Sequence, residues 1–230
     1  MYSLGKKHYT NKVHHHAYER YYEDFLNKYR DKRFNFLEIG MDSGASMGLW
    51  KDYFKYAKIY GLEIDNEHTE NRIKVMKGDQ SNINDLKKLV KLTKKCDVIL
   101  DDGSHVPEHQ LISFNYLFEN CLNDGGVYII EDIETSYWKK HTLYGYNIKA
   151  GPNATNNIVN IFRYILPIVN REFLKEEEIK KYYKYKKISN YVLDNISSIN
   201  FGMNCIIIKK MSKYERKKFF GRKYRFERFL

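Results

Sequence analysis

The chain has 230 residues, of which 43% are hydrophobic, and its formal net charge is +11. This length suits one globular domain that fills its core without disulfides. The cysteines, Cys96, Cys121 and Cys205, form no CxxC pair and lie in or beside apolar segments, so we expect buried thiols. No run approaches the roughly 20 apolar residues that cross a bilayer, and no apolar signal region opens the chain. We therefore expect a cytoplasmic protein.

The basic excess lies mainly after residue 171 and is densest in the closing segment, KYERKKFFGRKYRFERFL. An anionic substrate, a membrane surface or nucleic acid would suit it, and the interspersed Tyr and Phe rings could stack on bases. A composition biased toward Lys, Asn, Tyr and Ile explains the pattern without a binding role. We favour that explanation and do not expect a nucleic-acid partner.

The predicted elements alternate between helices and apolar strands. In chain order they are a helix over 16–30, a strand over 34–40, a helix over 46–54 and a strand over 57–64. A polar segment with helical potential follows, and then a short β-like segment before KGDQSN, a helix over 84–95, a strand over 96–102, a helix over 109–122, an NDGG turn and a strand over 127–132. After about residue 150 the pattern is less regular, until 197–210 supplies two strand candidates joined through a glycine.

This alternation predicts a doubly wound α/β fold, with a mostly parallel sheet and an antiparallel edge strand. We expect a single domain over 1–230, with an N-terminal helical or lid segment over about 1–33 and a basic tail over about 211–230. Ligands of such sheets bind beyond the carboxyl ends of the strands. Acidic residues at those ends are therefore the first candidates for a site.

A glycine loop follows the first predicted strand in LEIGMDSGAS, with Gly40 and Gly44 before a helix. Glycine lets the backbone turn sharply and approach a ligand closely. The spacing is neither the dinucleotide G-x-G-x-x-G nor a P-loop, so NAD and ATP become less probable ligands. Glycines between a strand and a helix are also common where nothing binds.

Polar residues at three successive strand ends strengthen the case for a nucleoside ligand. Glu63, in IYGLEID, falls where a carboxylate accepts hydrogen bonds from both ribose hydroxyls of an adenosine. Glu38 ends the first strand, and Asp79 and Gln80, in KGDQSN, fall where an adenine edge could be read. Each acid alone could be solvated or cap a helix.

A second group of acids occurs in ILDDGSH and IIEDIETSYW, at the ends of two further strands. Asp101, Asp102, Glu131 and Asp132 would crowd into one crevice, which raises carboxylate pKa values unless a cation intervenes. Divalent cations such as Mg²⁺ take oxygen ligands. His105 is close enough to Asp102 in sequence to serve as a general base. Helix capping by the acids and a merely solvated histidine are the alternatives.

These motifs, preceded by HHHAYERYY, resemble those of metal-dependent sugar O-methyltransferases of the mycinamicin and macrocin type and of related capsule and lipopolysaccharide enzymes. The resemblance covers roughly 5–140, and 197–210 is similar to the family's closing strands. It implies a class I methyltransferase fold, S-adenosylmethionine, and Mg²⁺ or Mn²⁺ held by Asp102, Glu131 and Asp132, with His105 as the base. The implied cofactor pocket comprises Glu38, Gly40, Ser43, Gly44, Glu63, Asp79, Gln80 and Asp101.

The resemblance leaves the acceptor open, because the sequence shows no counterpart of the N-terminal domain of the macrolide enzymes. We favour a nucleotide-linked or surface-glycan sugar, as in polysaccharide biosynthesis, since the basic excess would attract an anion. A homo-oligomer is compatible with the sequence, and 14–22 could form a lid. The rivals are a catechol or phenol O-methyltransferase, an RNA-binding or RNA-modifying protein, and a cephalosporin-hydroxylase-like protein, which lacks support from a 2-His-1-carboxylate set.

Overall fold

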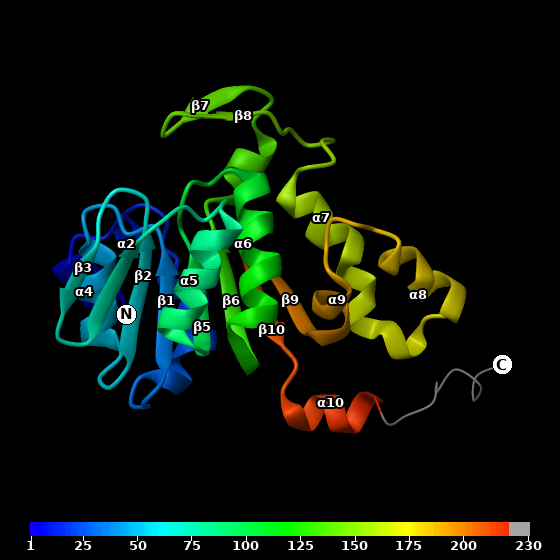
Figure 1. Cartoon of the computed structure of the whole chain (residues 1–230), viewed down its shortest axis with the longest axis horizontal. Helices are drawn as coiled ribbons and strands as arrows, with labels where there is room; N and C mark the ends of the chain where they lie inside the picture. Colours follow the sequence, from blue (N-terminus) through cyan, green and yellow to red (C-terminus); the bar gives the residue numbers. More distant parts are fainter. Residues whose placement is uncertain (221–230) are drawn as a thin grey trace.

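The computed structural model describes residues 1–220 and has one eight-stranded sheet at its centre (Figure 1). The strand order is β3-β4-β2-β1-β5-β6-β10-β9. Strands β4, β2, β1, β5 and β6 are parallel, whereas β3 pairs antiparallel with β4 and β10 pairs antiparallel with both β6 and β9. The strands are β1 Asn35–Ile39, β2 Lys58–Glu63, β3 His68–Glu70, β4 Ile73–Lys77, β5 Cys96–Asp101, β6 Leu122–Glu131, β9 Ile196–Gly202 and β10 Cys205–Lys210.

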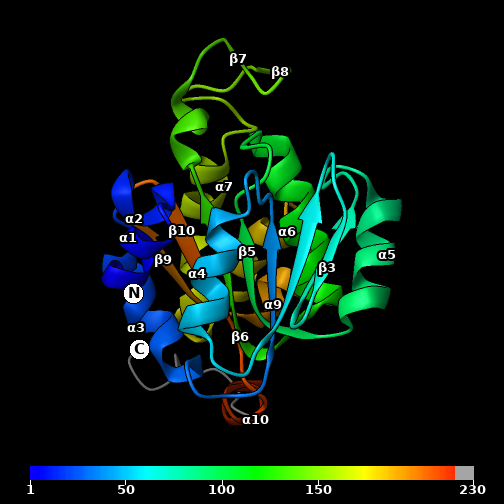
Figure 2. The same cartoon turned by 90° about the vertical axis from the view of Figure 1, so that its left-hand side faces the viewer.

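Helices cover both faces of this sheet, as Figure 2 shows for α4 and α5. Residues alternate along β1, so Leu37 and Ile39 join one core and Phe36 joins the other. The first core packs against α5 Ile83–Thr93, α6 Pro107–Asn120, α7 Ile158–Ile165 and α9 Asn190–Asn195. The second packs against α3 Glu19–Leu26, η1 Asn27–Tyr29 and α4 Ala45–Tyr53. Burial on both faces explains the continuous apolar runs of the central strands.

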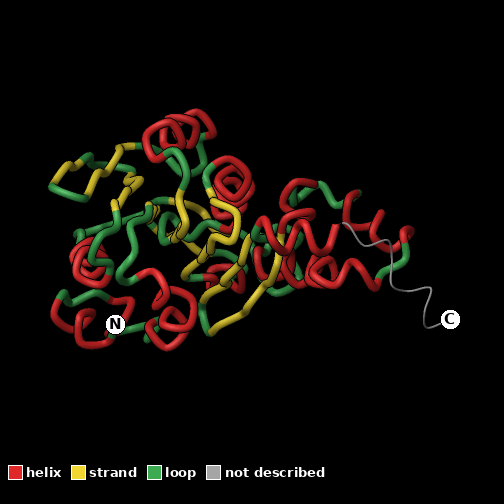
Figure 3. Tube along the Cα trace, turned by 90° about the horizontal axis from the view of Figure 1, so that it is seen from below, coloured by secondary structure: helices red, strands yellow, loops and turns green. Residues whose placement is uncertain are grey.

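The remaining elements lie around the sheet. The hairpin of β7 His141–Leu143 and β8 Tyr146–Ile148 projects beyond its upper end in Figure 1, after η2 Ile133–Tyr137. The helical segment after residue 150 gathers to one side of the sheet (Figure 3). The other helices are α1 Tyr2–Lys7, α2 Asn11–His14, η3 Leu166–Phe173, α8 Glu176–Tyr183 and α10 Lys213–Phe220.

The predicted α/β class and the mostly parallel sheet are confirmed, and two local predictions are wrong. The polar segment after β2 forms β3 rather than a helix, because it returns to pair with β4. The NDGG stretch lies inside β6 rather than in a turn, where Gly125 has φ of +77° and donates its N–H to Met211 O. The predicted antiparallel edge strand is confirmed, because β9 lies at one edge and pairs antiparallel with β10, and β3 lies at the other edge and pairs antiparallel with β4. Of the expected basic tail, 221–230 lie outside the described residues.

Candidate active site

A cavity of about 570 Å³ opens at the carboxyl ends of the parallel strands, where the sequence places its candidate residues. The loops after β1, β2, β4 and β5 supply most of its wall. The N-terminal segment and the β7–β8 hairpin complete it. The lining comprises residues 9–11, 39–43, 45–46, 62–65, 78–80, 102–105, 132, 144 and 146. Members of both predicted groups of site residues therefore border one space. They are Gly40, Ser43, Glu63, Asp79 and Gln80 of the first group and Asp102, His105 and Asp132 of the second.

The loop after β1 depends on glycine at one position above all. Gly40 has φ of +76°, and a Cβ there would lie 2.1 Å from the carbonyl oxygen of Asp102. No side chain fits, so the loop after β1 can approach the loop after β5 closely. Gly44 has φ of +82° at the start of α4, with open space where a Cβ would stand. Only Gly40 is thus required by both conformation and space.

Glu63 connects the end of β2 to this glycine loop. Its Oε2 accepts hydrogen bonds from the backbone N–H groups of Met41, at 2.7 Å, and Asp42, at 3.2 Å. Its Oε1 accepts one from the N–H of Ile64 at 2.7 Å. A carboxylate offers about four acceptor sites, so this partly exposed group retains capacity for donors from a ligand. Glu63 is therefore both a loop anchor and a cavity residue.

Asp79 and Gln80 also border the cavity, and each is held in place. Asp79 Oδ1 accepts hydrogen bonds from the backbone N–H and the hydroxyl of Ser81, at 2.7 and 2.8 Å. Gln80 Nε2 donates to Asp101 at 3.0 Å, and its Oε1 accepts from the N–H of Ser104 at 2.6 Å. Gln80 therefore ties the loop after β4 to the loop after β5.

Glu38 and Asp101, predicted to contact a cofactor, are fully buried and do not line the cavity. Glu38 points to α4 and accepts hydrogen bonds from Ser46 Oγ at 2.8 Å and Trp50 Nε1 at 3.1 Å. Asp101 points to the opposite face and accepts from Gln80, Ser113 and Tyr128. Burial raises the pKa of both carboxyls. Each carboxylate supports cavity residues from behind, and the prediction of direct contact is corrected accordingly.

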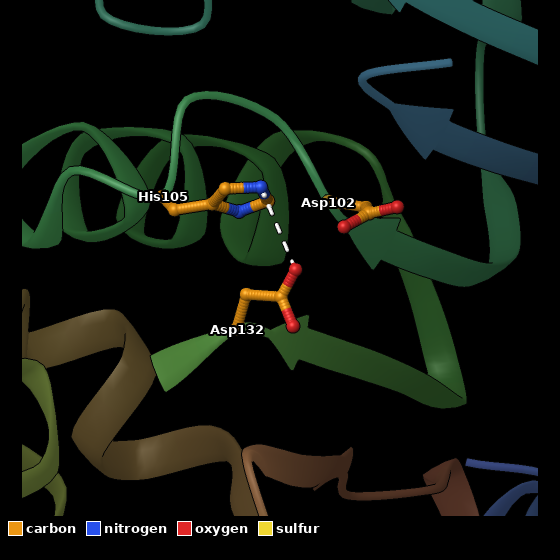
Figure 4. A group of neighbouring side chains, drawn as sticks. All are labelled: Asp102, His105 and Asp132. Atoms are coloured by element: carbon orange, nitrogen blue, oxygen red, sulfur yellow. Dashed lines mark ion pairs between the residues drawn. The ribbon is translucent and has the colours of Figure 1, made fainter. Parts of the chain in front are cut away.

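Asp102, His105 and Asp132 point toward one another (Figure 4). Each offers one oxygen or nitrogen atom, and these atoms lie within 4.8 Å of one another. His105 Nε2 is 3.5 Å from Asp132 Oδ2. The His105 Nδ1 atom is buried and has no hydrogen-bond partner among the described residues. Two carboxylates and an imidazole suit a divalent cation or proton transfer.

The backbone holds His105 and Asp132 in left-handed conformations, with φ of +56° and +50°. Such conformations are uncommon outside glycine and persist where surrounding contacts impose them. Thr135 Oγ1 donates to His105 O at 2.6 Å. Asp132 Oδ1 accepts from Tyr18 OH at 2.5 Å and from Asn204 Nδ2 at 2.9 Å. These contacts aim both side chains at the same point.

Glu131, predicted as a metal ligand, stands apart from this triad. It is 1% exposed; its Oε2 accepts a hydrogen bond from Lys12 Nζ at 2.6 Å and its Oε1 accepts one from Tyr22 OH. Burial raises the pKa of Glu131 well above its usual range, and the nearby Asp102 adds to the effect. Both oxygens are therefore already engaged by the protein.

The N-terminal segment supplies residues that the sequence analysis did not single out. Lys12 and Tyr22 bind Glu131, and Tyr18 binds Asp132. His16 Nε2 lies 3.7 Å from Asp132 Oδ1, whereas His14 stacks on Tyr9. The HHHAYERYY motif was visible in the sequence, but neither its contacts nor Lys12 could be derived from spacing.

The fold with this arrangement of strand ends is that of the class I methyltransferases. The chain is similar to the mycinamicin methyltransferase MycE, solved in complex with Mg, S-adenosylhomocysteine and mycinamycin VI, with 26% identity and a TM-score of 0.78. The match covers 92% of this chain and 53% of MycE.

Curated relatives are sugar O-methyltransferases. The chain is 35% identical over 144 residues to a rhamnosyl tetracenomycin-C 2'-O-methyltransferase of Streptomyces olivaceus, covering 59% of this chain and 38% of the relative. It is 27% identical to the mycinamicin VI 2''-O-methyltransferase of Micromonospora griseorubida, covering 82% and 49%. The chain thus spans less than half the length of these relatives. No family model matches the chain. Within residues 1–220, every helix is too short or too polar to cross a bilayer.

Proposed function

We propose that this chain is an S-adenosylmethionine-dependent and divalent-metal-dependent O-methyltransferase that acts on a sugar hydroxyl. One observation carries the proposal: the glycine loop with Glu63 and the Asp102, His105 and Asp132 triad border the same cavity. The first feature suits a nucleoside cofactor, and the second suits activation of a hydroxyl. The sugar O-methyltransferases among its relatives support the same reading.

The residues of the cavity fit S-adenosylmethionine. Because residue 40 is glycine, no side chain fills the space between the loops after β1 and β5. Glu63 would accept hydrogen bonds from the ribose hydroxyls, and Asp79 and Gln80 would face the adenine. Ser43 and Gly44 belong to the glycine loop between β1 and α4, which would also contact the cofactor. When bound, this cofactor supplies an electrophilic methyl group on a sulfonium. MycE was solved with S-adenosylhomocysteine, which is the demethylated form of this cofactor.

The carboxylates fit Mg²⁺ or Mn²⁺, since both cations prefer oxygen ligands. Asp102 and Asp132 would hold the ion, because they belong to the cluster of ligand atoms that opens to the cavity. A bound divalent ion lowers the pKa of a hydroxyl and fixes its approach. Both oxygens of Glu131 are engaged by Lys12 and Tyr22, so Glu131 would not bind the ion itself. It would hold Lys12, which contacts Asp102.

His105 would be the general base. Its buried Nδ1 has no partner within the described part of the chain, so this atom can accept the hydroxyl proton. Asp132, 3.5 Å from Nε2, would stabilise the positive charge that the ring then gains. His105 and Asp132 would in this way prepare the hydroxyl oxygen to receive the methyl group that the cofactor would supply, with S-adenosylhomocysteine as the leaving group.

The acceptor that we favour is a nucleotide-linked or surface-glycan sugar. The net charge of +11 would attract a diphosphate or an anionic glycan by long-range electrostatics. Tyr9, Tyr144 and Tyr146 border the cavity and offer flat apolar faces beside polar tips, which suit the mixed surface of a sugar ring. Such a reaction would serve capsule or other polysaccharide biosynthesis.

The experiment is methyl transfer from radiolabelled S-adenosylmethionine to a panel of nucleotide sugars, glycans, catechols and short RNAs with Mg²⁺. We expect label in a sugar that carries a vicinal diol, and much less when the neighbouring hydroxyl is removed. Label that appears only in a catechol would refute the sugar proposal and would indicate that the tyrosines at the rim of the cavity bind a planar acceptor. Label that appears only in RNA would refute the sugar proposal as well.

A further inference from the structure

Lys12 places a buried ammonium group among three carboxylates. Its side chain is 2% exposed, and its Nζ contacts Glu131 at 2.6 Å, Glu38 at 3.1 Å and Asp102 Oδ2. Lysine is seldom fully buried unless it is paired. Three carboxylates in contact with one ammonium group, Glu38, Asp102 and Glu131, favour its charged form. The group is therefore a fixed positive charge.

The backbone around Lys12 is held as firmly as its side chain. Thr10 Oγ1 accepts the N–H of Lys12 at the start of α2, and Lys12 O accepts the N–H of Tyr18 at 2.8 Å. His8 Nε2 lies 2.8 Å from Asp52, and the N-terminal amine lies 2.5 Å from Glu23. These contacts fix the segment against α3 and α4. The ammonium cannot easily leave the cluster.

The contacts of the ammonium distinguish two overlapping groups of side chains in the site. The inner group comprises Glu38, Glu131 and the Oδ2 atom of Asp102, all of which contact Lys12. The outer group comprises Asp102, His105 and Asp132, which meet at the cavity. Asp102 belongs to both. Glu131 is held in the inner group from its other side by Tyr22 OH.

We propose that Lys12 is a positioning residue, a tethered cation that occupies the inner group and confines divalent-metal binding to a single outer site. The inference rests on the proposed function. Without this charge, two more buried carboxylates would be open to a divalent ion, since anions this close need a counter-charge. The presence of Lys12 therefore determines which carboxylates bind the metal, and Glu131 binds Lys12 rather than the metal.

The proposal predicts an unequal response of two neighbouring acids. Glu131→Gln keeps its shape and should change the Mn²⁺ dissociation constant by less than about threefold, because Glu131 is not a ligand. Asp132→Asn, which also tolerates the left-handed backbone, should weaken Mn²⁺ binding by at least roughly tenfold. In the Lys12→Met protein, Glu131 becomes free to bind, so Mn²⁺ should bind at least roughly tenfold more tightly or as a second equivalent.

The test is Mn²⁺ titration of the full chain, read by electron paramagnetic resonance, for wild type, Glu131→Gln, Asp132→Asn, Lys12→Met, Lys12→Arg and the Lys12→Met/Glu131→Gln double variant. Lys12→Arg keeps the charge and should behave as wild type. The double variant should lose the gain of Lys12→Met by at least roughly tenfold. Circular dichroism and binding of S-adenosylhomocysteine establish that each variant is folded.

Failure of this inference is separable from failure of the proposed function. If wild type binds one Mn²⁺ and Glu131→Gln loses as much affinity as Asp132→Asn, Glu131 is a ligand and the inference is overturned, while the metal-dependent function stands. That comparison decides even if Lys12→Met does not fold. If Lys12→Met folds and binds Mn²⁺ as wild type does, the inference is also overturned. If wild type binds no Mn²⁺, the metal in the proposed function is refuted together with the inference.

Discussion

Glu63 binds the backbone of the glycine loop even without a ligand. Its carboxylate accepts hydrogen bonds from the N–H groups of Met41, Asp42 and Ile64, which are otherwise without secondary-structure partners at the end of β1 and β2. A carboxylate with spare acceptor capacity at this place can also receive ribose hydroxyls. Removing it should therefore loosen the loop and remove a ligand contact together.

We expect Glu63→Ala to weaken binding of S-adenosylhomocysteine roughly ten- to a hundredfold, about 1.5–3 kcal/mol, because charge-assisted hydrogen bonds are lost. Isothermal calorimetry measures this. Glu67→Gln is the matched control, since Glu67 lies just after the same strand but outside the lining of the cavity. Unchanged affinity in Glu63→Ala would remove Glu63 from the cofactor site.

His105 combines an unusual backbone conformation with a buried, unpartnered ring nitrogen. An alanine at this φ of +56° would add strain, whereas asparagine tolerates left-handed backbone. We expect His105→Asn to lower the turnover number by roughly 10²–10⁴ with nearly unchanged S-adenosylhomocysteine affinity. Steady-state kinetics with the sugar found in the panel, together with calorimetry, measure both. A change confined to the Michaelis constant would make His105 a binding residue.

At the scale of elements, the glycine loop offers a matched pair of substitutions. Gly40→Ala and Gly44→Ala both place a side chain at positive φ, but only at Gly40 would the new Cβ meet backbone atoms. We expect Gly44→Ala to cost about 1–2 kcal/mol of unfolding free energy, from conformation alone, and Gly40→Ala to cost clearly more. Urea unfolding compares the two. Equal costs would show that the loops after β1 and β5 separate easily.

The β7–β8 hairpin brings an aromatic side chain close to His105. The ring centroids of Tyr144 and His105 are 5.7 Å apart, and Tyr144 is 70% exposed at the rim of the cavity. Because an exposed aromatic ring there contributes little to folding, it is available to an acceptor. Residues 9–11 of the N-terminal segment also line the cavity.

We expect Tyr144→Ala to raise the Michaelis constant for the sugar acceptor roughly two- to tenfold, the size of one aromatic contact. The affinity for S-adenosylhomocysteine should stay the same. Tyr137→Ala is the control, because Tyr137 is also exposed but does not line the cavity. Equal effects of the two variants would exclude a specific role for the hairpin tip.

At the scale of the whole molecule, the order of the sheet separates two tasks. Strands β1, β2 and β4 supply the glycine loop, Glu63 and Asp79, whereas β5 and β6 supply Asp102 and Asp132. The two groups meet only because β1 and β5 are adjacent in the sheet. Cofactor binding and metal binding are therefore expected to respond separately to chelation.

We expect excess EDTA to abolish methyl transfer and added Mg²⁺ to restore it, while S-adenosylhomocysteine binding stays within about threefold of its value with Mg²⁺, since different strands carry the two sites. Activity assays and calorimetry on one preparation measure both. Full turnover in EDTA would refute the metal requirement. Loss of cofactor binding in EDTA would show that the two groups of residues act as one site.

The parts of the fold and site that the sequence determines follow from local pattern. Apolar strands that alternate with helices impose crossover connections and hence a parallel sheet, and parallel strands bring their carboxyl ends to one edge. For that reason Glu63, Asp79, Asp102 and Asp132 could be placed around one cavity from their positions alone. The short β3 could not be predicted, because its polar residues form a strand only by pairing with β4.

Tertiary structure alone decided which acids face the cavity and which are held by the protein. Alternation along a strand sends Asp101 toward α6 and Asp102 toward the site, but it does not fix how deeply either is buried. Lys12 reaches Glu131 across 119 positions of the chain, and Tyr22 reaches it across 109. Such contacts depend on how the N-terminal segment packs against the finished sheet, and no spacing in the sequence encodes that packing.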